Sequence, residues 1–266
     1  MSGAYALAAA VALAAVPATR PSGEATFLAA KAAFVAHERP PYVVYTLERR
    51  DRRGGMPDFE NSYDLRIWCR TKDRAAVSRR MFGDRIVGPP EFLVPAFDEV
   101  VDPGPPTANM FEDALFAPPA PAATAVPDES PLPTIGGVRT VYDRQYRVTG
   151  FRRSGDQWEI DLAPRRDPQR NRIEAIWVDA ATLAVRRMRV RDHLYLSFSA
   201  EVLDDEFDVR FTERDGLPMI SAIHGHTPLE PYETDYTFRD VAFPRTLPDW
   251  YFHPEQYGQH RGDPPS

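Results

Sequence analysis

The feature that most constrains this sequence is a series of short segments with alternating apolar and polar residues, separated by turn signals. Between residues 138 and 243 such segments follow one another about every ten residues. Ser154-Gly155-Asp156 and Asp215-Gly216 are two of the intervening turn signals. No helical segment long enough to connect parallel strands lies between them. The pattern therefore predicts an antiparallel sheet and excludes a βαβ architecture.

The first half of the chain adds one helix and three strands to this prediction. Residues 23–37 are rich in helix formers with an amphipathic spacing, and Pro40-Pro41 ends the helix. Tyr42–Leu47, Leu65–Cys69 and Ala75–Phe82 are β-branched, aromatic or alternating, which is typical of strands. Arg49–Asn61 contains Gly54-Gly55 and is predicted to be a hairpin loop.

Alternation also predicts which face of the sheet is buried. Apolar side chains two residues apart point to the same side of a strand. The sets that should share one face are Leu65, Ile67 and Cys69; Trp158, Ile160 and Leu162; Phe207, Val209 and Phe211; and Tyr236 and Phe238. A single helix covers only part of a large curved sheet, so either the sheet curls around the helix or its concave face keeps an apolar cavity.

A proline-rich segment, residues 88–137, interrupts the strand pattern. The whole chain has 27 prolines, and many of them cluster here together with large apolar residues. Linkers are usually polar. Two interpretations stay open: an irregular loop pinned over the core, or a lid that covers or occupies a binding cavity. The apolar residues of the segment are Phe92, Leu93, Val94, Phe97, Met110, Phe111, Leu115 and Phe116.

The N-terminus predicts export. Ala4 to Val16 is uncharged and too short to span a bilayer, and small residues precede Thr19, so residues 1–18 are predicted to be a signal peptide. No Lys or Arg precedes the apolar run, which leaves an ordinary apolar helix as the alternative. We expect residues 19–266 to form one periplasmic or secreted domain with no transmembrane segment, ending in a polar tail at 253–266.

The sequence carries no motif for catalysis, and no cofactor or metal is expected. Phosphate-binding loops, zinc-ligand Cys patterns and nucleophile elbows are absent. Cys69 alternates with charged residues and is expected to be a buried hydrophobe. His224 and His226 share one side of a strand and could hold a metal with Asp192, His193 or Glu230, but polar outer-face residues are the favoured interpretation. The net charge of −7 argues against nucleic-acid binding.

At this point the order of elements resembles a known family, the LolA/LolB-like superfamily of periplasmic lipoprotein carriers and outer-membrane lipoprotein-sorting proteins. The resemblance rests on the first helix ending near Pro40, the strand Tyr42–Leu47, the strand–turn–strand segment Ile173–Arg187, and the closing strand Tyr236–Phe243 with Leu247–Phe252. It covers nearly the whole mature chain through loose motifs. It implies a mainly β (α+β) fold: a large curved antiparallel sheet that forms an incomplete barrel around an N-terminal helix, with a lid.

Together these observations predict a non-catalytic protein that binds an apolar ligand, such as a lipid or a lipoprotein acyl chain, as a carrier or envelope sensor. A membrane-associated protein is a further possible partner. The alternatives are a self-plugged structural or regulatory protein that binds a protein partner and, less favoured, a secreted metal-dependent enzyme. The residues predicted to contact the ligand are Phe92, Leu93, Phe97, Met110, Phe111, Leu115, Phe116, Trp68 and Trp158.

Overall fold

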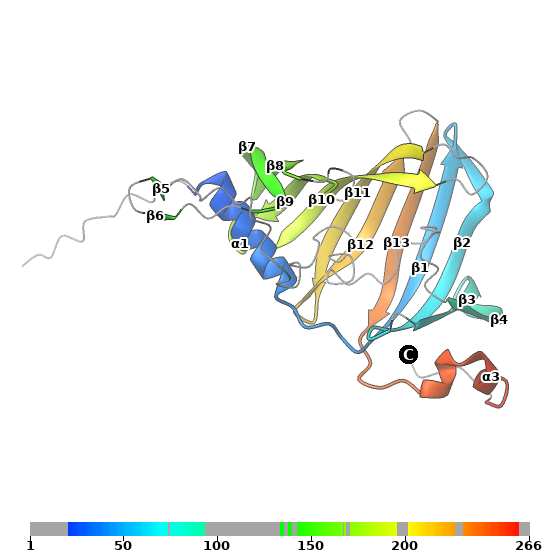
Figure 1. Ribbon diagram of the computed structural model, residues 1–266. Coiled ribbons are helices and arrows are strands. Elements are labelled where there is room, and N and C mark those ends of the chain that lie inside the picture. Colours follow the sequence, from blue (N-terminus) through cyan, green and yellow to red (C-terminus); the bar gives the residue numbers. More distant parts are fainter. Residues whose placement is uncertain are drawn as a thin grey trace, which may run out of the picture.

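A computed structural model describes residues 21–73, 75–93, 134–135, 138–139, 143–166, 168, 171–195, 202–226 and 231–260, with the backbone alone at 93, 134–135, 138–139, 192–195 and 202–205. Eleven antiparallel strands form one strongly curved sheet that does not close into a barrel (Figure 1). The predicted fold class is therefore confirmed.

The strands of this sheet run in the order β4-β3-β2-β1-β13-β12-β11-β10-β9-β8-β7, so that β4 and β7 are its edges. Their bounds are β1 Tyr42–Arg53, β2 Met56–Arg70, β3 Ala75–Phe82, β4 Arg85–Leu93, β7 Tyr146–Ser154, β8 Gln157–Pro164, β9 Ile173–Asp179, β10 Val185–Tyr195, β11 Val202–Arg214, β12 Leu217–His226 and β13 Tyr232–Ala242. The remaining elements are the helix α1 Gly23–Val35, the two-residue strands β5 Thr134–Ile135 and β6 Val138–Arg139, the 3₁₀ helix η1 Asp249–Phe252 and the helix α3 Pro254–Tyr257.

The middle of the sheet joins the two ends of the chain. β1 pairs with β2 on one side and with β13 on the other, so that Leu47 lies opposite both Leu65 and Phe238. Every other neighbouring pair in the sheet follows directly in sequence, and the proline-rich interval connects the two edge strands, β4 and β7. The sheet is thus a meander whose two halves meet at the β1–β13 pair.

The predicted hairpin loop at Arg49–Asn61 is wrong. β1 continues to Arg53 and β2 begins at Met56, so the connection is only Gly54-Gly55. Both glycines have positive φ values, +59° and +78°, which is the conformation that a two-residue hairpin turn requires. The charged residues here are compatible with a strand because cross-strand ion pairs such as Arg50–Asp64 take them up.

One other boundary differs from the sequence-based expectations. β4 runs through Gly88 to Leu93, because Gly88 has a φ of +77° and prolines are tolerated at the outer side of an edge strand. Hydrogen-bonding partners on the neighbouring strand outweigh the local turn signals there. β10 and β11 are long strands: β10 continues to Tyr195, and β11 begins at Val202 and includes the acidic residues before Phe207.

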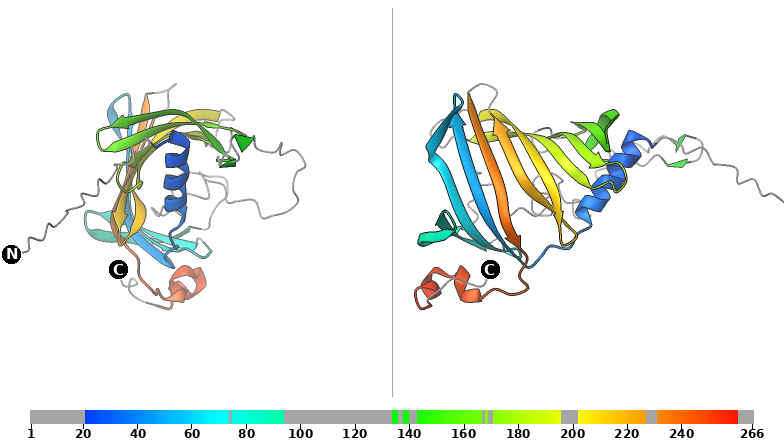
Figure 2. Two further views of the ribbon diagram at one scale, coloured as in Figure 1. Left: turned by 90° about the vertical axis from the view of Figure 1, so that its left-hand side faces the viewer. Right: turned by 180° about the vertical axis from the view of Figure 1, so that it is seen from behind.

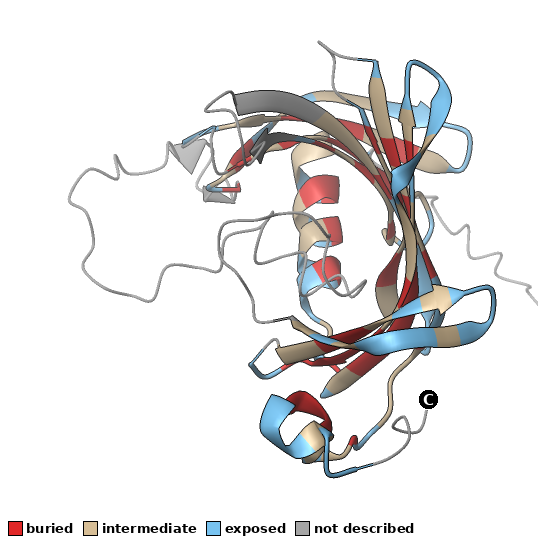
Figure 3. Ribbon diagram, turned by 90° about the vertical axis from the view of Figure 1, so that its right-hand side faces the viewer, coloured by how far each residue is buried: buried red, intermediate tan, exposed pale blue. Residues whose placement is uncertain are grey.

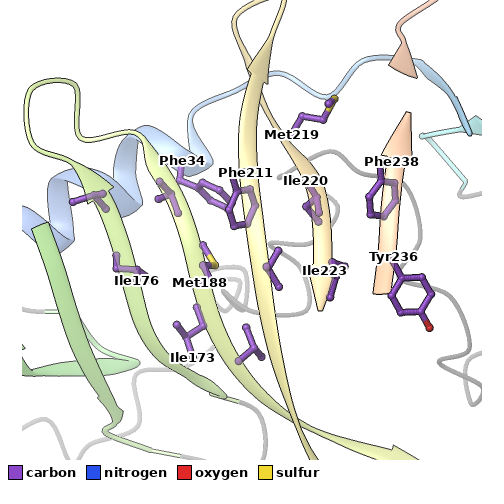
Figure 4. Packing of buried hydrophobic residues seen from close by; sticks show 14 of the residues in the cluster. Phe34, Ile173, Ile176, Met188, Phe211, Met219, Ile220, Ile223, Tyr236 and Phe238 are labelled. Atoms are coloured by element: carbon purple, nitrogen blue, oxygen red, sulfur yellow. The ribbon is translucent and has the colours of Figure 1, made fainter. Parts of the chain in front are cut away.

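The helix α1 stands inside the curve of the sheet (Figure 2). Ser22 caps it, because its hydroxyl accepts a hydrogen bond from the Ala25 amide at 3.2 Å. Phe27 and Phe34 are seven residues apart on the buried side. Phe27 meets Tyr146 of β7 edge to face at 6.2 Å, and Phe34 meets Phe211 of β11 at 5.3 Å (Figure 4).

Two clusters of buried apolar side chains lie on opposite faces of the sheet, because adjacent residues of β1 and of β2 belong to different clusters. Figure 3 shows the buried residues on α1, along the strands and in the C-terminal helical segment. The convex cluster, on the outer face of β1 to β3, contains Val44, Trp68, Val77, Leu247, Tyr251 and Phe252. The concave cluster faces α1 and contains Phe27, Ala30, Phe34, Val43, Tyr45, Leu47, Leu65, Ile67, Tyr146, Trp158, Ile160, Leu162, Ile173, Ile176, Val178, Val185, Met188, Val190, Val209, Phe211, Met219, Ile220, Ile223, Tyr236, Phe238 and Val241.

The concave cluster confirms most of the side chains that alternation predicted to share a face. Phe207 is only partly buried but packs against it. Cys69 is buried, as expected for a small hydrophobe, but belongs to neither cluster.

Candidate functional site

Four neighbouring strands, β12, β13, β1 and β2, present a continuous apolar surface on the concave side of the sheet. None of its side chains is more than 7% exposed. We call this surface the apolar face; it consists of Ile220 and Ile223 on β12, Phe238 on β13, Tyr45 and Leu47 on β1, and Leu65 and Ile67 on β2. Tyr45 and Phe238 pack ring against ring at 5.8 Å, so the face is continuous across the β1–β13 junction.

The apolar face extends beyond the reach of α1. A 13-residue helix is about 20 Å long and about 10 Å wide. Eleven strands spaced about 4.8 Å apart make a sheet about 48 Å across, measured along its curve. Laid across the strands, the helix therefore spans about five of them, and its ring contacts with β7 and β11 lie at the two ends of that span. The burial of the side chains on β13, β1 and β2 therefore does not come from α1.

The apolar face ends in a buried ion pair. Two residues beyond Leu47, the Arg49 guanidinium donates from Nε and Nη2 to the Asp51 carboxylate at 3.0 and 2.9 Å. The Asp51 side chain is fully buried. Tyr232 donates its hydroxyl to the same carboxylate. Arg49 also lies over the rings of Tyr63 and Tyr236, at 5.7 and 5.6 Å from their centres.

In this buried pair the positive charge of Arg49 is offset by the carboxylate of Asp51. Burial lowers the pKa of Arg49, but the hydrogen bond to Asp51 and the neighbouring tyrosines more than offset this, and the pKa stays above its ordinary value. Burial and the Asp51 carboxylate raise the pKa of Tyr232, so its hydroxyl keeps the proton that it donates. This end of the face is rigid and polar, with no net charge from the pair.

The structure does not bring the predicted ligand-contacting residues together on this face. Trp158 lies in the concave cluster on β8, stacked on Phe151 at 4.7 Å. Trp68 belongs to the convex cluster, and Phe92 packs against that cluster. Only the backbone of Leu93 is described. The other predicted residues, Phe97, Met110, Phe111, Leu115 and Phe116, lie outside the described residues.

The alternation of side chains along β2 could have shown that Trp68 does not lie on the apolar face. Trp68 follows Ile67 directly, and successive side chains of a strand point to opposite sides. On the convex side Trp68 meets Tyr251 at 5.3 Å, and Phe92 meets Tyr257 at 5.7 Å. The C-terminal segment therefore covers these two residues. Part of the tail that we expected to be polar is packed, because Trp250 stacks on His260 at 4.2 Å.

The two histidines considered as metal ligands lie on the convex face. His224 Nδ1 is 2.7 Å from an oxygen of Asp235, and His226 Nε2 is 3.7 Å from an oxygen of Glu206. Arg191 also pairs with Glu206, which places the histidines in a surface of alternating charges. Within the described part of the chain, no three His, Cys, Asp or Glu side chains form a group that could hold a metal ion.

The fold and the face define an open, curved antiparallel sheet with an apolar concave side and one covering helix. No protein-family model matches the chain, and no curated protein matches it. Its structure is similar to that of a DUF1329 family protein from Desulfovibrio piger, at 12% identity over 88% of this chain and 96% of that one, with a TM-score of 0.43.

It is also similar to a LolA superfamily protein from Nitrosomonas europaea, at 11% identity over 86% of this chain and 98% of that one, with a TM-score of 0.40. A provisionally assigned outer-membrane lipoprotein-sorting domain from Vibrio parahaemolyticus matches at 11% identity over 86% of this chain and 95% of that one, with a TM-score of 0.42. The predicted resemblance is confirmed for the general architecture alone, because the sequence identities and TM-scores are low.

Among the residues that the structure describes, no helix is both long enough and apolar enough to cross a bilayer.

Proposed function

We propose that this protein binds an apolar ligand, such as a lipid or a lipoprotein acyl chain, on the apolar face, as a periplasmic carrier or envelope sensor that catalyses no reaction. The supporting observation is the mismatch between the width of the concave cluster and the width of α1. Apolar side chains of β13, β1 and β2 gain stability only against another apolar group. A hydrocarbon chain laid along these strands would provide that group.

The energetics of such a site give a usable affinity when the association cost lies in the lower part of its range. Burying an acyl chain contributes about 0.8 kcal/mol per methylene. A chain of about a dozen carbons therefore contributes about 10 kcal/mol, against an association cost of roughly 4–15 kcal/mol. The compensated Arg49–Asp51 pair offers no net charge to a ligand. The proposal therefore concerns the hydrocarbon part of the ligand rather than a charged head group.

Two sequence-based expectations belong to this proposal. Residues 1–18 would direct export, and residues 88–137 would supply a lid whose Leu93, Phe97, Met110, Phe111, Leu115 and Phe116 contact the ligand. The apolar face is buried in the chain without ligand. Ligand entry therefore requires a conformational change that exposes it.

The proposal is tested by displacement of a fluorescent fatty acid from delipidated protein, with a matched pair of variants. Ile67→Ala removes apolar surface from the apolar face, whereas Val77→Ala removes it from the convex cluster; both residues are almost fully buried. We expect saturable micromolar or tighter binding that Ile67→Ala weakens several-fold and Val77→Ala leaves within twofold. Both variants must first show a cooperative unfolding transition.

The alternative is a protein whose own chain plugs the concave face permanently and whose partner is another protein. Its support is the burial of the apolar face without ligand. No fatty-acid binding by folded, delipidated protein would reject the carrier proposal and favour this alternative. Equal effects of the two variants would place the ligand elsewhere.

A further inference from the structure

Exposed large apolar side chains gather in two hairpins at one end of the sheet. The five such residues among those described are Met56, Phe59, Phe82, Val87 and Val35. Four of them belong to the β1–β2 and β3–β4 hairpins, which are neighbours in the sheet (Figure 1). Phe59 and Phe82 are 83% and 79% exposed, which is unusual for phenylalanine.

A groove connects the two hairpins. Its volume is about 510 Å³, and it is lined by Pro57 and Phe59 of β2, by Arg50 and Arg52 of β1, and by Met81 of β3, among others. Across the β3–β4 pair, Phe82 lies opposite Arg85 and Arg80 lies opposite Val87, so these four side chains share one side of that hairpin. The groove links this hairpin to Phe59 of β2. We call the combined surface the hairpin surface: Met56, Phe59, Phe82 and Val87 with the groove between them.

Carboxylates pair with the arginines that line the groove, Arg50 and Arg52, whereas two arginines beside Phe82 and Val87 differ. Arg80 and Arg85 are exposed on the β3–β4 hairpin and form no ion pair in the described structure. Elsewhere, exposed arginines such as Arg152 and Arg191 are paired with carboxylates on neighbouring strands. Arginines without a counter-ion beside protruding aromatic rings match an anionic phospholipid surface, in which rings enter the interface and guanidinium groups pair with phosphates.

We propose that the hairpin surface docks this protein on an anionic phospholipid membrane. The apolar residues protrude singly from two hairpins, with Arg80 and Arg85 beside Phe82 and Val87, whereas protein interfaces bury such residues in a closely packed central patch. The arrangement favours insertion of a few side chains to a shallow depth. Docking is reversible and depends on salt, because both the number of rings and the number of unpaired charges are small.

The test is co-sedimentation of the full chain with vesicles of phosphatidylethanolamine and phosphatidylglycerol, and with vesicles of phosphatidylcholine alone. We expect preferential binding to the anionic vesicles, reduced at least about fivefold when salt rises from 0.1 to 0.5 M. Phe59→Ser/Phe82→Ser should reduce binding at least about tenfold. Arg80→Gln/Arg85→Gln should remove the preference for anionic vesicles while leaving the weaker binding to phosphatidylcholine.

The matched control is Val35→Ser, which removes the exposed apolar side chain that lies outside the hairpins, at the end of α1. It should bind vesicles as the unmodified protein does. Absence of vesicle binding, or equal loss in Val35→Ser and Phe59→Ser/Phe82→Ser, would overturn the proposal. So would hairpin variants that lose only self-association or a protein contact.

Fatty-acid displacement on the same variants keeps this proposal separate from the ligand-binding proposal. The hairpin surface and the apolar face are different parts of the molecule. Docking without ligand binding, or ligand binding without docking, would therefore reject one proposal and leave the other.

Discussion

The concave and convex clusters lie on opposite faces of the same strands, yet different parts of the chain cover them. The concave cluster is covered in part by α1, which precedes the sheet in sequence. The convex cluster is covered by η1, which follows it. β1 contributes to both, which explains why Val43 to Leu47 are buried without interruption. An uninterrupted run of buried residues in a strand therefore marks a part of the sheet that is covered on both faces.

The other half of the convex face shows the contrast. On β10 to β13 the outward side chains form ion pairs such as Arg191–Glu206 and His224–Asp235 instead of apolar contacts. Apolar and polar residues alternate clearly in these strands, because one face of the sheet is exposed to water. The convex cluster is therefore a local addition to a sheet whose main core is concave, and the two clusters should differ in what their loss does to the molecule.

The largest expected effect is in the concave cluster. Phe27 is fully buried between α1 and Tyr146, so Phe27→Ala should lower the free energy of unfolding by about 3–5 kcal/mol. Because this cluster runs through the whole sheet, unfolding should stay a single transition in urea, followed by circular dichroism. A loss below about 1 kcal/mol would show that α1 adds little to the core.

The second prediction uses the pH dependence of the same contact. Burial raises the pKa of Tyr146 to about 12, from an ordinary value of 10.0. The native state therefore favours the protonated phenol, and this contribution is complete below pH 10. It is lost as the pH rises from 10 to about 12, by about 3 kcal/mol for two pKa units. Urea titrations at these pH values should show the loss, and Tyr146→Phe should remove that component of it.

In the convex cluster the effect should be smaller and local. Phe252→Ala removes a ring that stacks on Tyr42 at 6.2 Å and lies under Arg70. We expect a loss of about 2 kcal/mol. The C-terminal segment should separate from the sheet before the sheet unfolds. Increased quenching of tryptophan fluorescence by acrylamide, with unchanged far-ultraviolet circular dichroism, would show this. If the quenching and the circular dichroism changed together, the two clusters would unfold as one unit.

The smallest effect compares two hydroxyls on opposite faces of the sheet, one on β3 and one on β1. Ser78, opposite Ile67 on the concave side, is buried, and its hydroxyl has no hydrogen-bond partner among the described residues. Thr46, on the convex side, contacts Asp240 and accepts a hydrogen bond from Arg66 at 3.1 Å. Ser78→Ala should be neutral or stabilising by up to about 1 kcal/mol, whereas Thr46→Val should cost about 1–2 kcal/mol. Thermal denaturation of both variants measures the difference, and a costly Ser78→Ala would contradict it.

Much of the fold could be predicted because strand alternation and turn chemistry are local. Asp215-Gly216 adopts positive φ values of 53° and 78° and connects β11 to β12, as its sequence predicts. Most of the predicted residues of the concave cluster follow from the two-residue spacing of apolar side chains alone. The charged strand segment around Arg50 was missed, because its stability comes from cross-strand partners that a single sequence does not identify.

The candidate site was less accessible than the fold. Sequence alone favoured aromatic residues, but it did not show which face each one occupies, and Trp68 and Trp158 lie on opposite sides. The apolar face consists mainly of ordinary strand residues such as Leu47 and Ile67. Their significance comes from the sheet being wider than its helix, which is a property of the assembled fold.

The pairing of β1 with β13 has a consequence for how the molecule is made. Both strands belong to the centre of the sheet, yet one emerges early and the other late in synthesis. Until the late strand arrives, the early hairpins keep an unpaired edge that is open to aggregation. Contacts between residues so distant in sequence also slow folding. A nascent chain therefore stays incomplete until nearly its whole length is available, and a chaperone that shields the edge of β1 would raise the yield of folded protein.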